Sequence, residues 1–133
     1  MDAQQSGLPG SPLVLSYKGL TPDDELVDWI AHGEVGGIVL FRDNCTDEAA
    51  LRAAVALMRD TSPQPLYIMI DEEGGRVRRL SDGPASMRDL REYEHVPVSD
   101  IGRAYGSTAQ RLNALGIDTL LAPVVDIGHD GAE

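Results

Sequence analysis

Cysteine is nearly absent from this sequence of 133 residues, which contains only Cys45. A single thiol cannot form an internal disulfide, so packing and hydrogen bonds have to stabilise the fold, as is usual in a reducing compartment. The sequence also lacks any apolar run near the roughly 18 residues that a membrane-spanning helix needs. Its N-terminus lacks the basic and apolar segments of a secretion signal. We therefore expect a soluble, cytoplasmic protein that does not enter a membrane.

Positive charge is scarce as well. The chain has 11 Lys and Arg against 22 Asp and Glu, which gives a formal net charge of -11. A protein that binds nucleic acid needs a basic surface to neutralise phosphates, so the charge balance argues against nucleic acid as a partner. An anionic membrane surface is disfavoured for the same reason.

Short apolar segments alternate along the chain with amphipathic ones. We predict strands at residues 13–17, 37–41, 66–70 and 119–125. We predict a helix in each interval, with N-caps at Thr21, Thr46 and Ser99. Strands that are apolar throughout and separated by helices are typical of a parallel α/β sheet, either covered by helices on both faces or closed into a barrel.

The length of the chain bears on the choice between these architectures. An eight-stranded barrel usually takes about 250 residues, so this chain would supply roughly half of one. Residues 126–133 follow the last predicted strand directly, without a helix to cover it. We expect an incomplete domain whose uncovered strands make it poorly soluble or self-associating.

The predicted strand at 66–70 leads into a cluster of charged residues. Asp71 follows it directly, and Arg79 comes after two glycines and two other arginines. Functional side chains in parallel sheets gather at the C-terminal ends of the strands. A carboxylate that accepts from two hydroxyls and a guanidinium that donates in a fixed fork are suited to a polyhydroxylated ligand. The same two groups would also serve as an ion pair that only holds the loop, and both interpretations stay open.

Other ligands are less suited to this cluster. A phosphate would be repelled by the acidic residues 71–73, and no glycine-rich turn here leads directly into a helix. A divalent cation would need residues 71–73 together with Asp126, but successive residues on a strand point to opposite faces. The histidines lack the paired spacing of a zinc site; they are His32, His95 and His129. We predict neither a metal nor a cofactor.

Three blocks of the sequence resemble the N-terminal barrel of glycoside hydrolase family 3, in the branch of bacterial β-N-acetylhexosaminidases that take part in peptidoglycan recycling. The blocks are residues 36–44, residues 70–79, and residues 116–118 with 121–127. The middle block, with Asp-Glu-Glu-Gly-Gly-Arg at 71–76, is the most specific. Glu72 stands where the family usually has Gln, and we expect this change to touch neither Asp71 nor Arg79. The resemblance covers residues 13–129, and residues 1–133 are assigned to a partial barrel domain of this family.

The resemblance implies a TIM barrel, of which this chain supplies the N-terminal half. It also implies a retaining hydrolase that removes terminal N-acetylglucosamine through a covalent glycosyl-enzyme. It assigns two substrate contacts, Asp71 and Arg79, and no catalytic residue, because the family's nucleophile and acid/base couple follow the block that ends near Asp126. We expect the chain alone to be an inactive portion of such an enzyme. The alternatives are a non-catalytic sugar-binding half-barrel, a subunit completed by a second chain, and a metal-dependent barrel enzyme.

Overall fold

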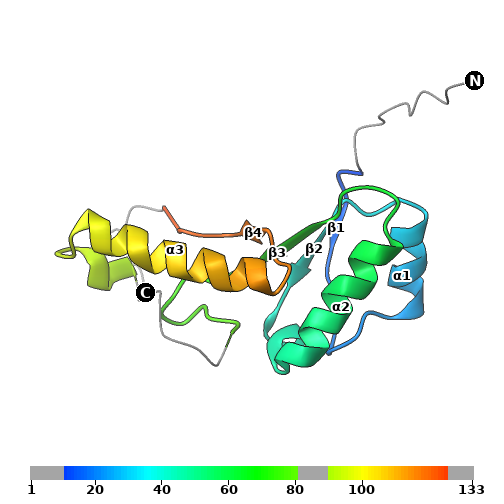
Figure 1. Cartoon of the computed structure of the whole chain (residues 1–133), viewed down its shortest axis with the longest axis horizontal. Helices are drawn as coiled ribbons and strands as arrows, with labels where there is room; N and C mark the ends of the chain where they lie inside the picture. Colours follow the sequence, from blue (N-terminus) through cyan, green and yellow to red (C-terminus); the bar gives the residue numbers. More distant parts are fainter. Residues whose placement is uncertain (1–10, 81–89, 126–133) are drawn as a thin grey trace, which may run out of the picture.

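The computed structural model describes residues 11–80 and 90–125. Its elements are β1 (Val14–Leu15), α1 (Asp24–Ala31), β2 (Gly37–Leu40), the short 3-10 helix η1 (Arg42–Cys45), α2 (Glu48–Thr61), β3 (Tyr67–Ile70), the 3-10 helix η2 (Leu90–Tyr93), α3 (Val98–Ala114) and β4 (Thr119–Leu120). The strands are parallel and lie in the order β1-β2-β3-β4 (Figure 1). The predicted parallel α/β arrangement is confirmed.

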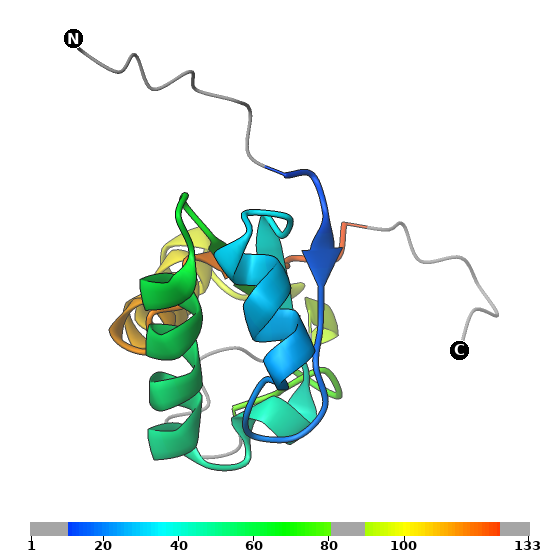
Figure 2. The same cartoon turned by 90° about the vertical axis from the view of Figure 1, so that its right-hand side faces the viewer.

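Helices α1, α2 and α3 pack on the same face of this sheet (Figure 2). The strand side chains on that face are fully buried; they are Ile38, Leu40, Ile68 and Ile70. The opposite face, called the open face below, carries Tyr67 with 57% of its surface exposed and Val14 with 42% exposed. The described part of the sheet is therefore covered on one side, as the wall of a barrel is, and not on both sides as in a doubly wound sheet.

The core lies between the helices and the sheet. The buried residues of α2 are Leu51, Ala54, Val55 and Met58, which share one face at helical spacing. Leu26 and Ile30 of α1 and Leu112 of α3 complete this layer. None of the helices in the described ranges is both long and apolar enough to cross a membrane.

The helices begin at different residues from those predicted. Asp23 caps α1 and Asp47 caps α2, and each carboxylate accepts from the main-chain N–H three residues later at 2.9 Å. Pro97 precedes α3. The predicted caps, which lie within two residues of these positions, are Thr21, Thr46 and Ser99. A carboxylate is a stronger acceptor than a hydroxyl for the unpaired N–H groups of a first turn, so the aspartates prevail.

The last strand is shorter than predicted. β4 contains only Thr119 and Leu120, although the N–H of Leu121 still donates to the carbonyl of Ile70 at 2.9 Å. Pro123 has no N–H with which to continue the ladder. The predicted strand at 119–125 therefore ends early.

A glycine closes the connection between α3 and β4. Gly116 adopts φ 81, and its N–H donates to the carbonyl of Asn113 at 2.9 Å. A Cβ atom here would lie 2.8 Å from Cγ1 of Val55 in α2. Both the backbone conformation and the close approach of α2 require glycine at this position.

Asp118 ties the same connection to the rest of the fold. Its carboxylate pairs with Arg59 of α2 and accepts from Oγ1 of Thr119 at 2.8 Å and from the N–H of Ile68 at 3.4 Å. One side chain thus joins a helix to two neighbouring strands. The sequence block at residues 116–118 therefore has a structural role in joining α3 to the sheet.

Candidate functional site

The chain that leaves β3 sends two successive carboxylates in opposite directions. Ile70 is buried on the helix side, Asp71 follows with a quarter of its side chain exposed, and Glu72 is buried again with 7% exposed. The register places Met69 beside Val39, so Asp71 and Phe41, two residues further along each chain, lie on the open face. The two carboxylates therefore have separate environments.

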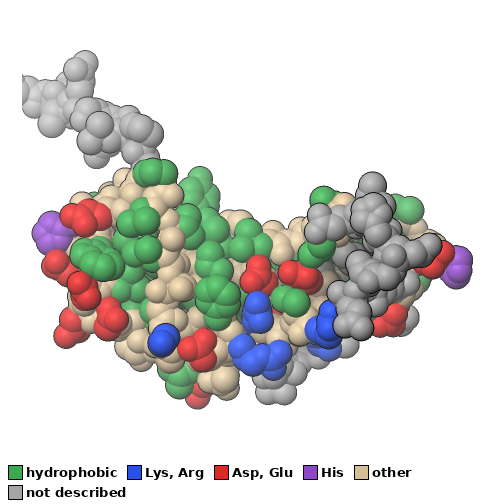
Figure 3. Space-filling model, turned by 180° about the vertical axis from the view of Figure 1, so that it is seen from behind, with side chains coloured by type: hydrophobic (Ala, Val, Ile, Leu, Met, Phe, Trp, Pro, Cys, Tyr) green, Lys and Arg blue, Asp and Glu red, His purple; other side chains and the backbone are tan. Residues whose placement is uncertain are grey.

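Asp71 and Arg79, the two predicted substrate contacts, lie together at this edge. Nη2 of Arg79 is 3.1 Å from Oδ2 of Asp71, and their side chains are 20% and 25% exposed. The guanidinium also lies 5.7 Å from the centre of the Phe41 ring, within cation–π range. Figure 3 shows acidic and basic side chains beside apolar ones on the face seen from behind. Within the described residues, the buried Nε of Arg79 has no acceptor.

A tight turn returns the chain so that Arg79 reaches Asp71. The N–H of Glu73 donates to the carbonyl of Val77 at 2.9 Å, and the N–H of Val77 donates to the carbonyl of Gly74 at 3.1 Å. Gly74 and Gly75 adopt φ 87 and 56, in the region that favours glycine. Both positions of this turn therefore favour glycine.

Glu72 departs from expectation. Its Oε2 accepts from the main-chain N–H of Arg79 at 2.7 Å and from that of Leu80 at 3.2 Å. Its Oε1 lies 4.0 Å from Nε of Arg78. The prediction that Glu72 touches neither substrate contact is wrong, because its carboxylate binds the main chain of Arg79 itself. The strand pattern indicated that Glu72 faces away from Asp71, but not that the loop returns above it.

Two residues of this edge were not predicted as part of the site, Phe41 and Asn44. Asn44 is fully buried; its Oδ1 accepts from the N–H of Phe41 at 2.7 Å, and its Nδ2 donates to the carbonyls of Tyr17 and Gly19 at 3.0 and 2.8 Å. An aromatic residue at the end of a strand followed by a polar turn was the available signal. Asn44 thereby connects the ends of β1 and β2.

The groups beneath the site hold their protons at neutral pH. Burial, with the nearby Glu72 carboxylate as the second cause, raises the pKa of Cys45 to about 11. Burial likewise raises the pKa of Tyr17 to about 12, with Cys45 and Asp43 adding to the effect. A thiol that stays protonated is a poor nucleophile, so Cys45 is not suited to covalent chemistry here.

The other sequence candidates do not converge. Among residues 11–80 and 90–125, no three His, Cys, Asp or Glu side chains are grouped so that they could hold a metal ion. His32 is exposed at the end of α1, and its hydrogen bond to the carbonyl of Asp28 raises its pKa. His95 is exposed too. Asp126 and His129 lie outside the described residues.

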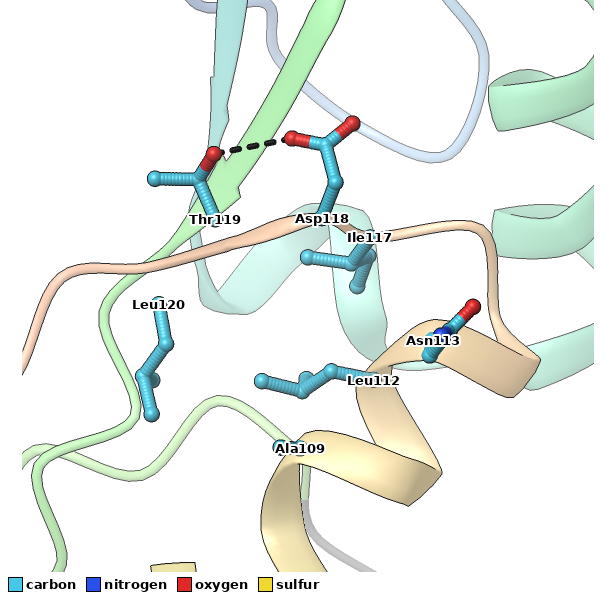
Figure 4. Close-up of a pocket in the computed structure, with 7 residues that line it drawn as sticks. All are labelled: Ala109, Leu112, Asn113, Ile117, Asp118, Thr119 and Leu120. Atoms are coloured by element: carbon cyan, nitrogen blue, oxygen red, sulfur yellow. Dashed lines mark hydrogen bonds between the residues drawn. The ribbon is translucent and has the colours of Figure 1, made fainter. Parts of the chain in front are cut away.

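The surface of the described structure is hollowed beside Phe41 and between α3 and β4. One hollow, of about 370 Å³, opens beside Phe41 and is lined by Val14, Leu15, Ser16, Val39 and Phe41. The other, of about 250 Å³, lies between α3 and β4 (Figure 4) and is lined by Ala109, Leu112, Asn113, Ile117, Asp118, Thr119 and Leu120. In the second hollow, Asp118 and Thr119 are hydrogen-bonded to each other, which leaves them less able to bind a ligand. The first hollow therefore adjoins the better binding groups.

Comparison with known proteins gives consistent relatives. The family described as Glycosyl hydrolase family 3 N terminal domain matches residues 9–133. A beta-hexosaminidase of Xanthomonas euvesicatoria pv. vesicatoria is 34% identical over 124 residues, which cover 88% of this chain and 37% of that protein. A beta-hexosaminidase of Photobacterium profundum is 38% identical over 121 residues, which cover 90% of this chain and 36% of that protein. The chain spans little more than a third of the length of these relatives.

Solved structures share the fold. The glycoside hydrolase family 3 beta-N-acetylglucosaminidase from Paenibacillus sp. str. FPU-7 matches 89% of this chain and 23% of its own, with a TM-score of 0.80 and 29% identity. NagZ from Neisseria gonorrhoeae, in complex with N-trifluoroacetyl-D-glucosamine, matches 90% of this chain and 38% of its own, with a TM-score of 0.77 and 25% identity. These likenesses confirm the predicted fold class, an α/β sheet that forms part of a TIM barrel.

Proposed function

Since this chain belongs to the glycosyl hydrolase family 3 N-terminal domain family, we propose that it supplies a sugar-binding edge of an enzyme that hydrolyses terminal N-acetylglucosamine. The observation that carries the proposal is the pairing of Asp71 with Arg79 at the C-terminal edge of β3, with both side chains partly exposed. This is the edge at which parallel barrels bind their substrates. NagZ, whose structure is similar to this one, was solved with an N-acylated glucosamine.

The geometry suits a sugar ring. The Asp71 carboxylate has oxygen lone pairs left to accept hydroxyl protons after its contact with Arg79, and the guanidinium has further N–H groups to donate. The exposed Phe41 ring and the hollow beside it offer apolar surface to the carbon-bound face of the sugar. A few directed polar groups beside an apolar surface are typical of a small-molecule site.

The bond-breaking groups are proposed to belong to other parts of the family's fold. A retaining glycosidase needs a nucleophile and a proton donor, about 5–5.5 Å apart. Asp71 and Arg79 are instead assigned to binding, with the nucleophile and the acid/base couple outside this sequence. The physiological setting that fits this activity is peptidoglycan recycling in the cytoplasm.

Titration calorimetry of the 133-residue chain with N-acetylglucosamine tests the proposal. Asp71→Ala and Arg79→Ala should each weaken the affinity about tenfold or more, the range for losing a charge-assisted hydrogen bond. Asp100→Ala is the matched control, because it breaks the exposed ion pair with Arg103 on α3. Equal affinity in all variants and the parent chain, or no binding at millimolar sugar, would refute the sugar-binding assignment. The pair would then be one that only holds the loop.

The open face supports one alternative, a subunit completed by a second chain, which can be tested together with the main proposal. Its exposed side chains, Val14, Phe41 and Tyr67, offer apolar surface to a second chain that would complete the barrel. A subunit of this kind would bind sugar without hydrolysing a chromogenic N-acetylglucosaminide until the second chain is added. Turnover by the isolated chain would contradict both this alternative and the proposed inactivity.

A further inference from the structure

Glu72 has an environment unlike that of the other acidic residues. It is the one Asp or Glu within the described ranges that is buried, with 7% of its surface exposed. Burying a carboxylate costs free energy unless hydrogen bonds and opposite charge compensate. The compensation here comes from the main-chain N–H groups of Arg79 and Leu80, at 2.7 and 3.2 Å, and from Arg78 at 4.0 Å.

These contacts fix the main chain at Arg79, from which its side chain extends. One carboxylate oxygen, Oε2, accepts hydrogen bonds from two successive N–H groups. These two bonds hold the main chain at Arg79 close to β3 and restrict its rotation. The guanidinium then reaches Asp71 at 3.1 Å and the Phe41 ring at 5.7 Å. A long arginine side chain is directional only when its main chain is held, because its rotamers otherwise spread over many positions.

We propose that Glu72 is a positioning residue for sugar binding: through the main chain of Arg79, it holds the guanidinium in place for the ligand that Asp71 shares. The proposal rests on the proposed function, because it concerns the same binding edge. What matters is that an acceptor oxygen reaches the two N–H groups, and the negative charge of Glu72 is secondary. Glutamine has the same reach and an amide oxygen with two lone pairs, whereas aspartate keeps the charge but is one methylene shorter.

Two substitutions of Glu72 distinguish the effect of its side-chain length from the effect of its charge. In the full 133-residue chain, we expect Glu72→Gln to keep the affinity for N-acetylglucosamine within about threefold and Glu72→Asp to weaken it about tenfold. Glu73→Gln and Glu73→Asp are the matched controls, because Glu73 holds the turn through its main-chain N–H. Both should bind like the parent chain. Amide hydrogen exchange at Arg79 and Leu80 gives a second measurement, with protection kept in Glu72→Gln and lost in Glu72→Asp.

Each outcome decides the matter. The proposal is overturned if Glu72→Asp binds like the parent chain, or if Glu72→Gln weakens binding as much as Glu72→Asp does. In both cases, the proposed function stands as long as Asp71→Ala still weakens binding. A parent chain that binds no sugar removes the proposed function and this inference with it. Should Glu72→Asp fail to fold, as judged by circular dichroism, the shorter neutral variant Glu72→Asn replaces it and should weaken the affinity about tenfold where Glu73→Asn does not. Equal affinities of Glu72→Asn and Glu73→Asn would overturn the proposal.

Discussion

Asp71 and Arg79 meet side chain to side chain, with 3.1 Å between Oδ2 and Nη2, although Arg79 comes eight positions after Asp71 along the chain. Such a partly exposed pair contributes little to folding, because solvent screens the charges and two side chains lose freedom. We therefore expect Asp71→Ala to change the free energy of unfolding by about 1 kcal/mol or less in urea titrations. A loss well above that value would show that the pair mainly holds the loop.

Two glycines near one helix should respond in opposite ways to alanine. Gly116→Ala should lower the free energy of unfolding by more than about 1 kcal/mol, because alanine at positive φ is strained and its Cβ meets Val55. Gly106→Ala, in the middle of α3 with open space around its Cα, should raise it by about 0.5–1 kcal/mol. Urea unfolding of both variants measures the two changes in the free energy of unfolding. Equal changes would contradict the geometry described for the connection between α3 and β4.

Asp118→Ala should lower the free energy of unfolding by about 1–2 kcal/mol, because it removes the acceptor for Thr119 and Ile68 and the partner of Arg59. Asp100→Ala, which removes an ion pair within the exposed surface of α3, should cost only about 0.3–0.5 kcal/mol. Thermal or urea unfolding measures both variants. The interpretation of Asp118 as a tie between α2 and the sheet fails if the two costs are equal.

Alkaline pH should destabilise the fold through Cys45. Its pKa in the folded state, about 11, lies above its ordinary value of 9.0, so the folded state favours the protonated thiol. The stabilisation is complete below pH 9 and is lost as the pH rises towards 11. Cys45→Ala should therefore lose less stability than the parent chain between these values, as measured by urea midpoints. Tyr17 titrates in both proteins, so parallel pH profiles would exclude the thiol as the cause.

The open face should cause self-association. Val14→Lys places a charge on this face and should shift the chain towards monomer in sedimentation velocity runs. Leu57→Lys on α2 is the matched control, because Leu57 and Val14 are both 42% exposed but Leu57 belongs to the helical layer. A shift of equal size in both variants would point to net charge, and not to the open face, as the cause.

The elements of the fold were largely predictable because their determinants are local. The helical spacing of Leu51, Ala54, Val55 and Met58 is that of one buried helix face, and the apolar run at residues 66–70 predicts β3. The helix starts were displaced because Thr21 and Thr46 stand close to aspartates that compete for the same role, and spacing alone does not rank them.

The site was predictable only in part. A strand that ends in Asp71 and a glycine turn that leads to Arg79 are visible in the sequence. The contact of Glu72 with the N–H of Arg79 depends on how the loop returns in space, and the approach of Phe41 depends on the register of β2 with β3. Contacts set by register and loop path carry no periodic signal along one chain.

The buried amide of Asn44 has a consequence for ligand affinity. It joins the N–H of Phe41 to the carbonyls of Tyr17 and Gly19, so the chain segments leaving β1 and β2 are connected through one side chain that both donates and accepts. Aspartate would supply no donor at that point and leucine neither group. A ligand that settles against Phe41 therefore meets a surface that is already ordered, and little of its binding energy is spent on immobilising the protein.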